Sequence, residues 1–290
     1  MTVQRPSILV GCDGSPESAT ALVWAADHAR ATGGSLHLLA AWEWPTFQGT
    51  PITYGRWDPA TDCRARLARL RESADLPADR VSCEVLRGNA AHLLVDRGHD
   101  ADLLVVGTHG MGAVSRVLLG SVSTYCATHS PVPVVIVRGR NPRARGVLVG
   151  VDDSDSARSA LKWAMDYADL IRQRLTVVNV IEPLALPIGP GFPAAVTTSA
   201  PATVHREARR ALRELVAKAE ADRGRPVGMG VTVRVLDGHP AHVLAWESKR
   251  ANVTVVGRHG AGGLHRLVVG SVASALAHHG ESTVVLTPSV

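Results

Sequence analysis

Two glycine-rich segments carry the residues with the clearest chemical potential. Each follows the pattern Gly-x-x-Gly, nine further residues, then Gly-Ser, beginning at Gly107 and at Gly257. Glycine is needed where a backbone turns with positive φ or approaches another group closely. A loop that leads from a strand into a helix directs several N–H groups at one point, where the helix N-terminus favours an anion. The pattern predicts a phosphate-binding loop in each half, with Ser121 and Ser271 at the helix start.

A tight turn without a ligand would also use glycine. Neither segment contains the Gly-Lys-Ser/Thr of a Walker loop, and Ser115 stands where the dinucleotide fingerprint has its third glycine. The long spacing nevertheless occurs twice and keeps side chains in register: His109 with His259, and Arg116 with Arg266. Because two chance turns would not keep this interval, we interpret both segments as phosphate cradles. The histidines either face solvent or donate near the phosphates, and the arginines either pair with phosphate or stay solvated.

An aspartate ends the first predicted strand of each half, at Asp13 and Asp152. In an open parallel sheet the ligand crevice lies at the carboxyl ends of the strands, where the strand order reverses. If the reversal falls between strands one and four, each aspartate faces a glycine loop. Its carboxylate would then accept hydrogen bonds from ribose hydroxyls or from the adenine amino group. The alternative is a turn aspartate that caps the next helix.

The two halves of the chain are repeats of one another, which points to one domain duplicated in tandem. Residues 8–13, 21–29, 85–90 and 105–110 match residues 147–152, 160–168, 235–240 and 255–260. The Arg-rich stretch from Arg138 to Arg145 is the expected joint. We therefore expect domains at residues 1–140 and 146–290.

Short Val/Ile/Leu runs alternate with longer segments of helical period in each half, which is typical of βαβ units and a parallel sheet covered on both faces. Helix start signals occur at Ser15, followed by Pro16, and at Ser154. The strands expected in the first half are Ser7–Cys12, Ser35–Ala41, Val81–Leu86, Leu103–Val106 and Val132–Val137. Residues 42–62 and 182–203 are rich in Pro and Gly and predict long loops, either lids and domain contacts or mobile surface loops.

The composition is that of an ordinary globular protein. The 290 residues suit two domains, 46% are apolar, and no apolar run reaches the length of a membrane span or of a secretory signal. The formal charge of +5 suits an anionic ligand, but no aromatic and basic motif accompanies it, so nucleic acid is a disfavoured partner. Four unpaired cysteines predict reduced, mostly buried thiols. A cytoplasmic location and no membrane partner are expected.

The Val-Gly-x-Asp near each domain start, combined with Gly-x-x-Gly-x9-Gly-Ser after strand four, resembles the universal stress protein family in its ATP-binding branch. The tandem arrangement is similar to that of actinobacterial members, and the resemblance covers essentially the whole chain. It implies two tandem Rossmann-like (adenine nucleotide alpha hydrolase-like) α/β domains. Each would hold a five-stranded parallel sheet of order 3-2-1-4-5 with helices on both faces.

The resemblance also implies ligands and partners. One ATP would bind per domain, with any Mg²⁺ held through the phosphates. Family members commonly dimerise through the last strand, so a homodimer is expected. In this chain residues 131–137 and 283–286 could pair with each other, forming an internal pseudo-dimer that could dimerise again.

The resemblance assigns adenine and ribose contacts to the strand ends and phosphate contacts to the glycine loops. Two departures concern the sites themselves: Ala41 is smaller than its counterpart Val180, and Met111 and Ala113 differ from their counterparts, so the sites need not match in affinity. The expected residues of the first site are Gly11, Asp13, Ala41, Val106, Gly107, Thr108, His109, Gly110, Met111, Gly112, Ala113, Arg116, Gly120, Ser121 and Val122. Those of the second are Gly150, Asp152, Val180, Val256, Gly257, Arg258, His259, Gly260, Ala261, Gly262, Gly263, Arg266, Gly270, Ser271 and Val272.

Three functions fit these features. The first is a stress or signalling regulator that binds ATP and has little or no catalysis, acting on a protein partner that the sequence does not name. The second is a slow ATPase or nucleotidyl-transferring enzyme, for which Asp13 with His109 is the best acid–base pair. The third is a flavin or nicotinamide carrier, since doubly wound sheets hold many cofactors.

Overall fold

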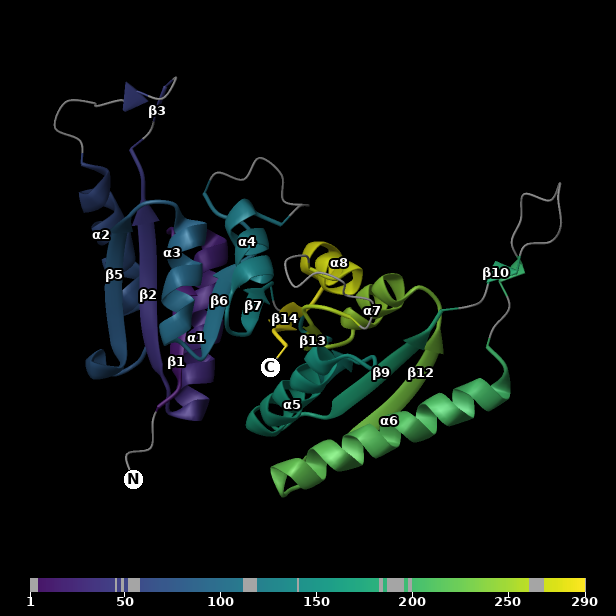
Figure 1. Cartoon of the computed structure of the whole chain (residues 1–290). Coiled ribbons are helices and arrows are strands. Elements are labelled where there is room, and N and C mark those ends of the chain that lie inside the picture. The colour runs from purple at the N-terminus through teal and green to yellow at the C-terminus, as the bar shows by residue number, and fades with distance from the viewer. Residues whose placement is uncertain are drawn as a thin grey trace, which may run out of the picture. The chain divides into compact units, whose positions relative to one another are not determined.

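The computed structural model describes residues 5–44, 46–47, 50–51, 58–111, 119–139, 141–182, 185–186, 196–197, 200–260 and 269–289. The chain divides into two compact units, Met1–Gly139 and Arg140–Val290 (Figure 1). Each unit is an α/β fold built on a parallel sheet, as the alternation of apolar runs and helical segments predicts.

The sheet of unit 1 has five parallel strands in the order β5-β2-β1-β6-β7. In chain order this is 3-2-1-4-5, so the first and fourth strands lie side by side and the order reverses between them. Every strand expected here is present, with its ends within two residues of the expected ones. The strands are β1 (Ser7–Gly11), β2 (Ser35–Trp42), β5 (Val81–Arg87), β6 (Leu103–Gly107) and β7 (Val134–Val137).

Unit 2 repeats the same sheet, in the order β12-β9-β8-β13-β14. Strands β13 and β14 are buried along nearly their whole length, as expected for a parallel sheet covered on both faces. The strands are β8 (Val147–Gly150), β9 (Leu175–Ile181), β12 (Val231–Asp237), β13 (Val253–Gly257) and β14 (Thr283–Thr287).

Four helices cover the sheet of unit 1, with α1 (Pro16–Thr32) and α2 (Pro59–Glu72) on one face and α3 (Ala90–Arg97) and α4 (Ser121–His129) on the other (Figure 1). The predicted start of α1 is confirmed, since the Ser15 side chain accepts from the Ser18 N–H and Pro16 opens the helix. Two 3₁₀ turns, η1 (Ala78–Arg80) and η2 (Gly98–Asp100), precede β5 and β6.

Unit 2 has the matching helices, with α5 (Asp155–Leu170) and α6 (Ala202–Arg223) on one face and α7 (Pro240–Ser248) and α8 (Ser271–His279) on the other (Figure 1). Ser154 caps α5 by accepting from the Ala157 N–H, as its place in the sequence predicts. The duplication seen in the sequence therefore extends to element order, strand order and the cap of the first helix.

Both long loops are shorter in the structure than the ranges 42–62 and 182–203 that the sequence predicts. Helix α2 begins at Pro59 because Asp58 caps it, and α6 already begins at Ala202. Between β2 and α2 the described residues include the paired two-residue strands β3 (Thr46–Phe47) and β4 (Thr50–Pro51). Their counterparts in unit 2 are β10 (Ala185–Leu186) and β11 (Val196–Thr197). Residues 45, 48–49, 52–57, 183–184, 187–195 and 198–199 of the two predicted loops lie outside the described residues.

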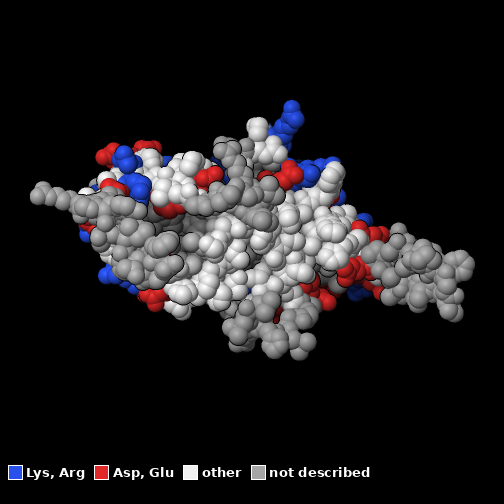
Figure 2. All heavy atoms as spheres, turned by 90° about the horizontal axis from the view of Figure 1, so that it is seen from above, with Lys and Arg blue, Asp and Glu red and all other residues white. Residues whose placement is uncertain are grey.

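Burial agrees with the expectations from composition. All four cysteines are free thiols, and Cys12, Cys63 and Cys126 are buried while Cys83 is exposed. None of the helices in the described ranges is long and apolar enough to cross a bilayer. On the face shown in Figure 2, Lys and Arg side chains occur together with Asp and Glu side chains.

The first glycine of each motif is fixed by helix packing. A Cβ on Gly107 would lie 2.8 Å from the backbone carbon of Glu17 in α1, and a Cβ on Gly257 would lie 2.8 Å from that of Ser156 in α5. A backbone cannot move aside as the end of a side chain can. Glycine here lets the first helix pack against the fourth strand in both units.

Replacing Gly107 by alanine should therefore destabilise unit 1. We expect Gly107→Ala to lower its free energy of unfolding by about 1–3 kcal/mol, the usual cost of overpacking. Gly139→Ala is the control, because a Cβ on Gly139 meets nothing within 4 Å, and it should change stability by less than about 0.5 kcal/mol. Urea titration, monitored by hydrogen exchange of residues in unit 1, measures the stability of both variants. Equal stabilities of the two variants would contradict the packing explanation.

Candidate functional site

A cavity of about 480 Å³ lies in unit 1 at the carboxyl ends of β1 and β6. It combines apolar side chains of β2, α3 and β6 with polar groups of the glycine loop and of the starts of α1 and α4. Its lining is Gly11, Cys12, Asp13, Ser18, Leu39, Ala41, Ala90, Leu94, Val106, Gly107, His109, Gly110, Met111, Gly120, Ser121, Val122 and Ser123. This is the strand-order reversal at which the sequence places the ligand crevice.

Unit 2 has a cavity of about 520 Å³ in the same position. Its lining is Gly150, Val151, Asp152, Ala157, Val178, Asn179, Val180, Pro240, Leu244, Val256, Gly257, His259, Gly260, Val269, Gly270, Ser271, Val272 and Ala273. Most of these residues are the repeat counterparts of the residues that line the first cavity. The duplication therefore preserves a hollow as well as a fold.

The structure brings most of the predicted site residues together around these cavities. Seven of them, namely Gly112, Ala113, Arg116, Ala261, Gly262, Gly263 and Arg266, lie outside the described residues. Of the predicted residues that the structure describes, Thr108 and Arg258 are the two that line neither cavity. Each directly follows a glycine that does line it, and side chains of successive residues in extended backbone point to opposite sides. The Arg258 side chain is instead buried, and this burial lowers its pKa to about 10.

These two residues still shape the site through their backbones. The Gly120 N–H donates to the Thr108 carbonyl over 2.8 Å, and the Gly270 N–H donates to the Arg258 carbonyl over the same distance. This hydrogen bond joins the two ends of the motif: the residue that follows its first glycine, and the glycine of Gly-Ser.

Asp13 takes the turn role and also contacts the glycine loop, while its contact with a nucleotide stays a prediction. Its Oδ1 accepts from the Ser15 N–H over 2.9 Å, which is the turn role, and its Oδ2 accepts from the Met111 N–H over 2.8 Å, across to the glycine loop. A Cβ on Gly110 would lie 2.5 Å from the same Oδ2. The second glycine of the motif is therefore required by the close approach of the Asp13 carboxylate.

Unit 2 keeps this approach and changes the details. A Cβ on Gly260 would lie 2.9 Å from Asp152 Oδ2, and Asp152 Oδ1 accepts from the Ser154 N–H over 3.0 Å. The loop is further attached to α5, because the Ser156 hydroxyl donates to the His259 carbonyl. In both units the strand-end aspartate and the second glycine are in contact.

The helix that follows the loop presents uncapped N–H groups to the cavity. In α4 and α8 the N-cap residues are Gly120 and Gly270, and among the described residues no side chain accepts a hydrogen bond at either start, which is also the case for α6 and α7. By contrast, Ser15, Asp58 and Asn89 cap the other three α-helices of unit 1. The first N–H groups of a helix have no partner within the helix. Here the first residues of both helices line the cavities.

His109 lines the first cavity, and its ring is oriented by its neighbour. Its Nδ1 lies 2.9 Å from Thr108 Oγ1, while its Nε2 is buried and has no hydrogen-bond partner within the described part of the chain. A solvent-facing ring would not bury this nitrogen. Buried polar atoms normally find partners, so this nitrogen is a polar group of the cavity lining that the described residues leave unsatisfied.

Several lining residues are absent from the predicted set. The signal for two of them was visible, because Ala90 and Pro240 belong to the repeated segments 85–90 and 235–240. Leu94 and Leu244 lie one turn further along α3 and α7. Their apolar character gave no indication of a site, since such residues also fill any core. No group of three or more His, Cys, Asp or Glu that could hold a metal ion occurs in the described ranges.

The hydrogen bonds of Asp13 predict a pH-dependent contribution to stability. Burial by itself raises the pKa of the Asp13 carboxyl, but hydrogen bonds from Ser15 and from the Met111 N–H outweigh it, and the pKa lies below its usual value. A depressed folded-state pKa contributes stability that is present above the unfolded value, about 3.9, and is lost as the pH falls through the folded value.

We therefore expect Asp13→Asn to lower the free energy of unfolding of unit 1 at pH 7 by roughly 1 kcal/mol, after allowance for partial solvent screening. The deficit relative to wild type should shrink as the pH falls below about 4. Urea titrations between pH 7 and pH 3 measure it, with Asp75→Asn as control because the Asp75 side chain is 92% exposed. A deficit independent of pH would rule out the carboxylate as its source.

Comparison with known proteins gives matches along nearly the whole chain. The profile of the Universal stress protein family matches residues 5–138 and again residues 144–288. A universal stress protein of Mycolicibacterium smegmatis is 30% identical over 96% of this chain and 96% of its own length. One of Mycobacterium tuberculosis is 31% identical over 98% of this chain and 97% of its own length.

The fold has a solved counterpart of similar length. A universal stress protein from Archaeoglobus fulgidus aligns with a TM-score of 0.65 over 98% of this chain and 96% of its own, at 19% identity. The double match of the family profile coincides with the two units, each of which has the same strand order and the same loop-lined cavity. The chain belongs to the universal stress protein family and carries two copies of its domain in tandem.

Proposed function

We propose that each of the two domains, residues 1–140 and 146–290, binds one ATP or a close adenine nucleotide. The protein would act as a nucleotide-dependent stress or signalling regulator with little or no catalysis. The observation that carries this proposal is the repeated cavity, which in both units is apolar at one end and meets an uncapped helix N-terminus at the other.

The apolar end suits the adenine base. In unit 1 it is formed by Ala41, Leu94 and Val106, and in unit 2 by the counterparts Val180, Leu244 and Val256. Ligand pockets for small molecules usually enclose about 300–1,000 Å³, and cavities of about 480 and 520 Å³ fall within this range. The smaller Ala41 leaves more room beside the base, so we expect the first site to hold it less tightly.

The strand-end carboxylate suits the sugar. Both oxygens of Asp13 already accept one main-chain N–H each. A carboxylate oxygen has two lone pairs, so each can accept a second bond. A ribose hydroxyl beside Asp13 or Asp152 would therefore find an acceptor that the protein itself holds in place.

The helix starts and loop amides suit the phosphates. The uncapped N-termini of α4 and α8 offer N–H groups and positive partial charge, and the Ser121 and Ser271 hydroxyls stand at the same positions. The buried Nε2 of His109 is a further group that a phosphate oxygen could satisfy. Any Mg²⁺ would be held mainly through the phosphates, since the described residues offer no cluster of metal ligands.

The contacts of the best acid–base pair argue against vigorous catalysis. Asp13 accepts from Ser15 and Met111, and His109 Nδ1 lies beside Thr108 Oγ1. Each side chain is thus engaged on one side by a neighbour in the protein. A general base needs a proton to abstract within hydrogen-bond reach and a tuned pKa, and these contacts give a binding role instead.

Binding is tested with purified full-length protein by isothermal titration with ATP and by chromatography of any ligand released on denaturation. We expect two sites per chain in the wild type and one in either Gly110→Val or Gly260→Val. A valine side chain at these positions would displace the aspartate that contacts each glycine. The double variant should bind none.

Gly139→Val is the matched control, because the space around Gly139 is open, and it should keep both sites. Circular dichroism and urea titration establish that the variants remain folded. A wild type that neither retains an adenine nucleotide nor binds one would refute the proposal. Release of a flavin or nicotinamide cofactor would replace it.

The rate of ATP hydrolysis distinguishes a regulator that only binds ATP from a slow ATPase. We expect phosphate release from ATP by the wild type to equal that of the Asp13→Ala, Asp152→Ala double variant within the background of the assay. Hydrolysis that persists through stringent purification and disappears in the double variant would favour an ATPase.

The proposal also covers the cellular location and the oligomeric state of the protein. We expect a cytoplasmic homodimer, on the strength of the family likeness. Light scattering of the purified chain with and without ATP measures its mass, and a monomer under both conditions would contradict the dimer without affecting the nucleotide sites.

A further inference from the structure

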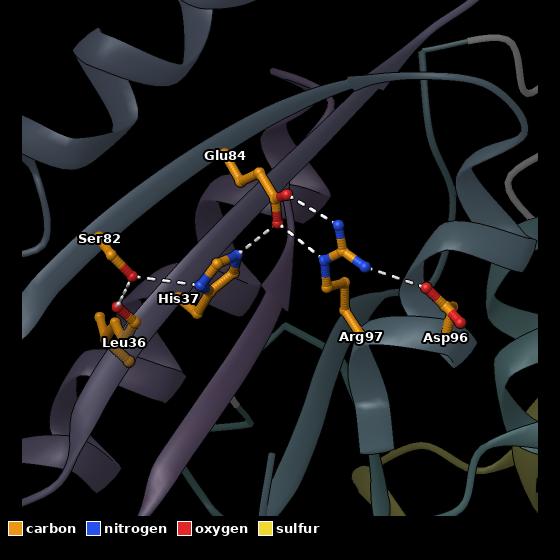
Figure 3. A network of polar contacts seen from close by, with 6 residues as sticks. All are labelled: Leu36, His37, Ser82, Glu84, Asp96 and Arg97. Atoms are coloured by element: carbon orange, nitrogen blue, oxygen red, sulfur yellow. Dashed lines mark hydrogen bonds and ion pairs between the residues drawn. The ribbon is translucent and has the colours of Figure 1, made fainter. Parts of the chain in front are cut away.

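A polar network joins helix α3 to the edge of the sheet in unit 1 (Figure 3). Arg97, the last residue of α3, donates from Nε to Glu84 Oε2 over 3.1 Å and from Nη2 to Glu84 Oε1 over 3.0 Å. Glu84 belongs to the edge strand β5. His37 of β2 approaches the same carboxylate, with its Nε2 3.0 Å from Glu84 Oε2. The three side chains are each about one-third exposed or less.

Unit 2 contains the same pair with its charges exchanged. Arg234 of β12 donates from Nη1 to Glu247 Oε2 over 2.6 Å and from Nη2 to Glu247 Oε1 over 3.2 Å. Here the strand carries the arginine and the helix α7 carries the glutamate, whose side chain is only 10% exposed.

The four residues occupy equivalent places in the two units. Glu84 and Arg234 each lie three residues after the first residue of their strands, Val81 and Val231. Arg97 and Glu247 each lie eight residues after the N-cap of their helices, Asn89 and His239. Both signs have changed between the repeats while the bidentate pairing has persisted. A solvated surface charge has no need of a complementary partner, so this compensation indicates that the attachment itself matters.

The attached helix is a wall of the nucleotide cavity. Ala90 and Leu94 of α3 line the first cavity, as Pro240 and Leu244 of α7 line the second. The contact with the first strand is close, since a Cβ on Gly11 would lie 3.0 Å from Leu94 Cδ1 and one on Gly150 would lie 2.6 Å from Leu244 Cδ1. A small rotation of either helix would move these leucines within the space proposed for adenine.

Neither helix is long enough to be stable by itself. Helix α3 has eight residues and α7 has nine, whereas isolated helices shorter than about 12–15 residues are marginal in water. Their orientation must therefore come from tertiary contacts. The charged pair supplies one at the C-terminal end of the helix, and its two parallel hydrogen bonds fix direction as well as distance.

We propose that the pairs Glu84–Arg97 and Arg234–Glu247 position the helices that form the base-binding walls, so that each pair sets the nucleotide affinity of its own domain. These are positioning residues, since none of the four lines a cavity. The inference rests on the proposed nucleotide binding and adds the residues that adjust it.

The repeat provides the test. In full-length Gly260→Val, where only the first site is expected to bind, ATP affinity is measured by titration for Glu84→Arg, Arg97→Glu and the double exchange that copies the polarity of unit 2. We expect each single variant to weaken ATP binding about tenfold, equivalent to ~1.4 kcal/mol. The double exchange should restore it to within about threefold.

Two further variants separate positioning from general stability. Arg30→Glu breaks the exposed Asp27–Arg30 pair on α1 and should leave affinity unchanged. Glu84→Gln keeps the shape of the side chain and serves if a charge reversal prevents folding; it should weaken binding less than Glu84→Arg. Hydrogen exchange in residues 90–97 should increase in the single variants and return in the double exchange.

The outcomes distinguish this inference from the proposed function. If the parent chain binds ATP and the single variants bind it equally well, the pair does not set affinity. If the double exchange remains as weak as the single variants, the pairing is not what matters. A parent chain that binds no nucleotide removes the proposed function and this inference together.

Discussion

The contact between a strand-end carboxylate and a glycine is the constraint on which both sites depend. In unit 1 the Asp13 carboxylate lies against Gly110 and accepts the next N–H of the loop, while its other oxygen holds the turn into α1. One side chain thus connects the ends of the first and fourth strands at the point where the strand order reverses. This contact is one of the attachments that fix the start of the loop above the sheet. In unit 2 Asp152 and Gly260 keep the same approach.

The glycines of the motif serve different physical purposes although they form one pattern. Gly107 allows a helix backbone to pack against the fourth strand, and Gly110 admits a carboxylate. Gly120 closes the loop on the Thr108 carbonyl and begins α4 without a side-chain cap. Only the last of these purposes directly concerns an anion. A motif read as a phosphate cradle is therefore largely a set of packing requirements that leave amides free at one edge.

Divergence between the two units shows which features tolerate change. The carboxylate, the loop-closing bond and the uncapped helix start are kept, and the cavities have nearly the same volume. The apolar wall changes in size, from Ala41 to Val180, and the ion pair behind it reverses its charges. Geometry at the polar end is thus held more strictly than composition at the apolar end. Directional hydrogen bonds restrict residue type more than non-directional burial does.

The sequence by itself determined the duplication, the parallel α/β fold, the helix starts at Ser15 and Ser154, and most residues around the cavities, because periodicity, glycine spacing and cap residues are local signals. It also placed Asp13 opposite the loop once the strand order was assumed. Only the tertiary structure shows that Thr108 and Arg258 are absent from the cavity linings, since side-chain direction depends on where each strand ends. Only the tertiary structure shows that Leu94 lines the cavity and that Glu84 pairs with Arg97. The type of an apolar or charged residue does not indicate which residues the fold will bring beside it.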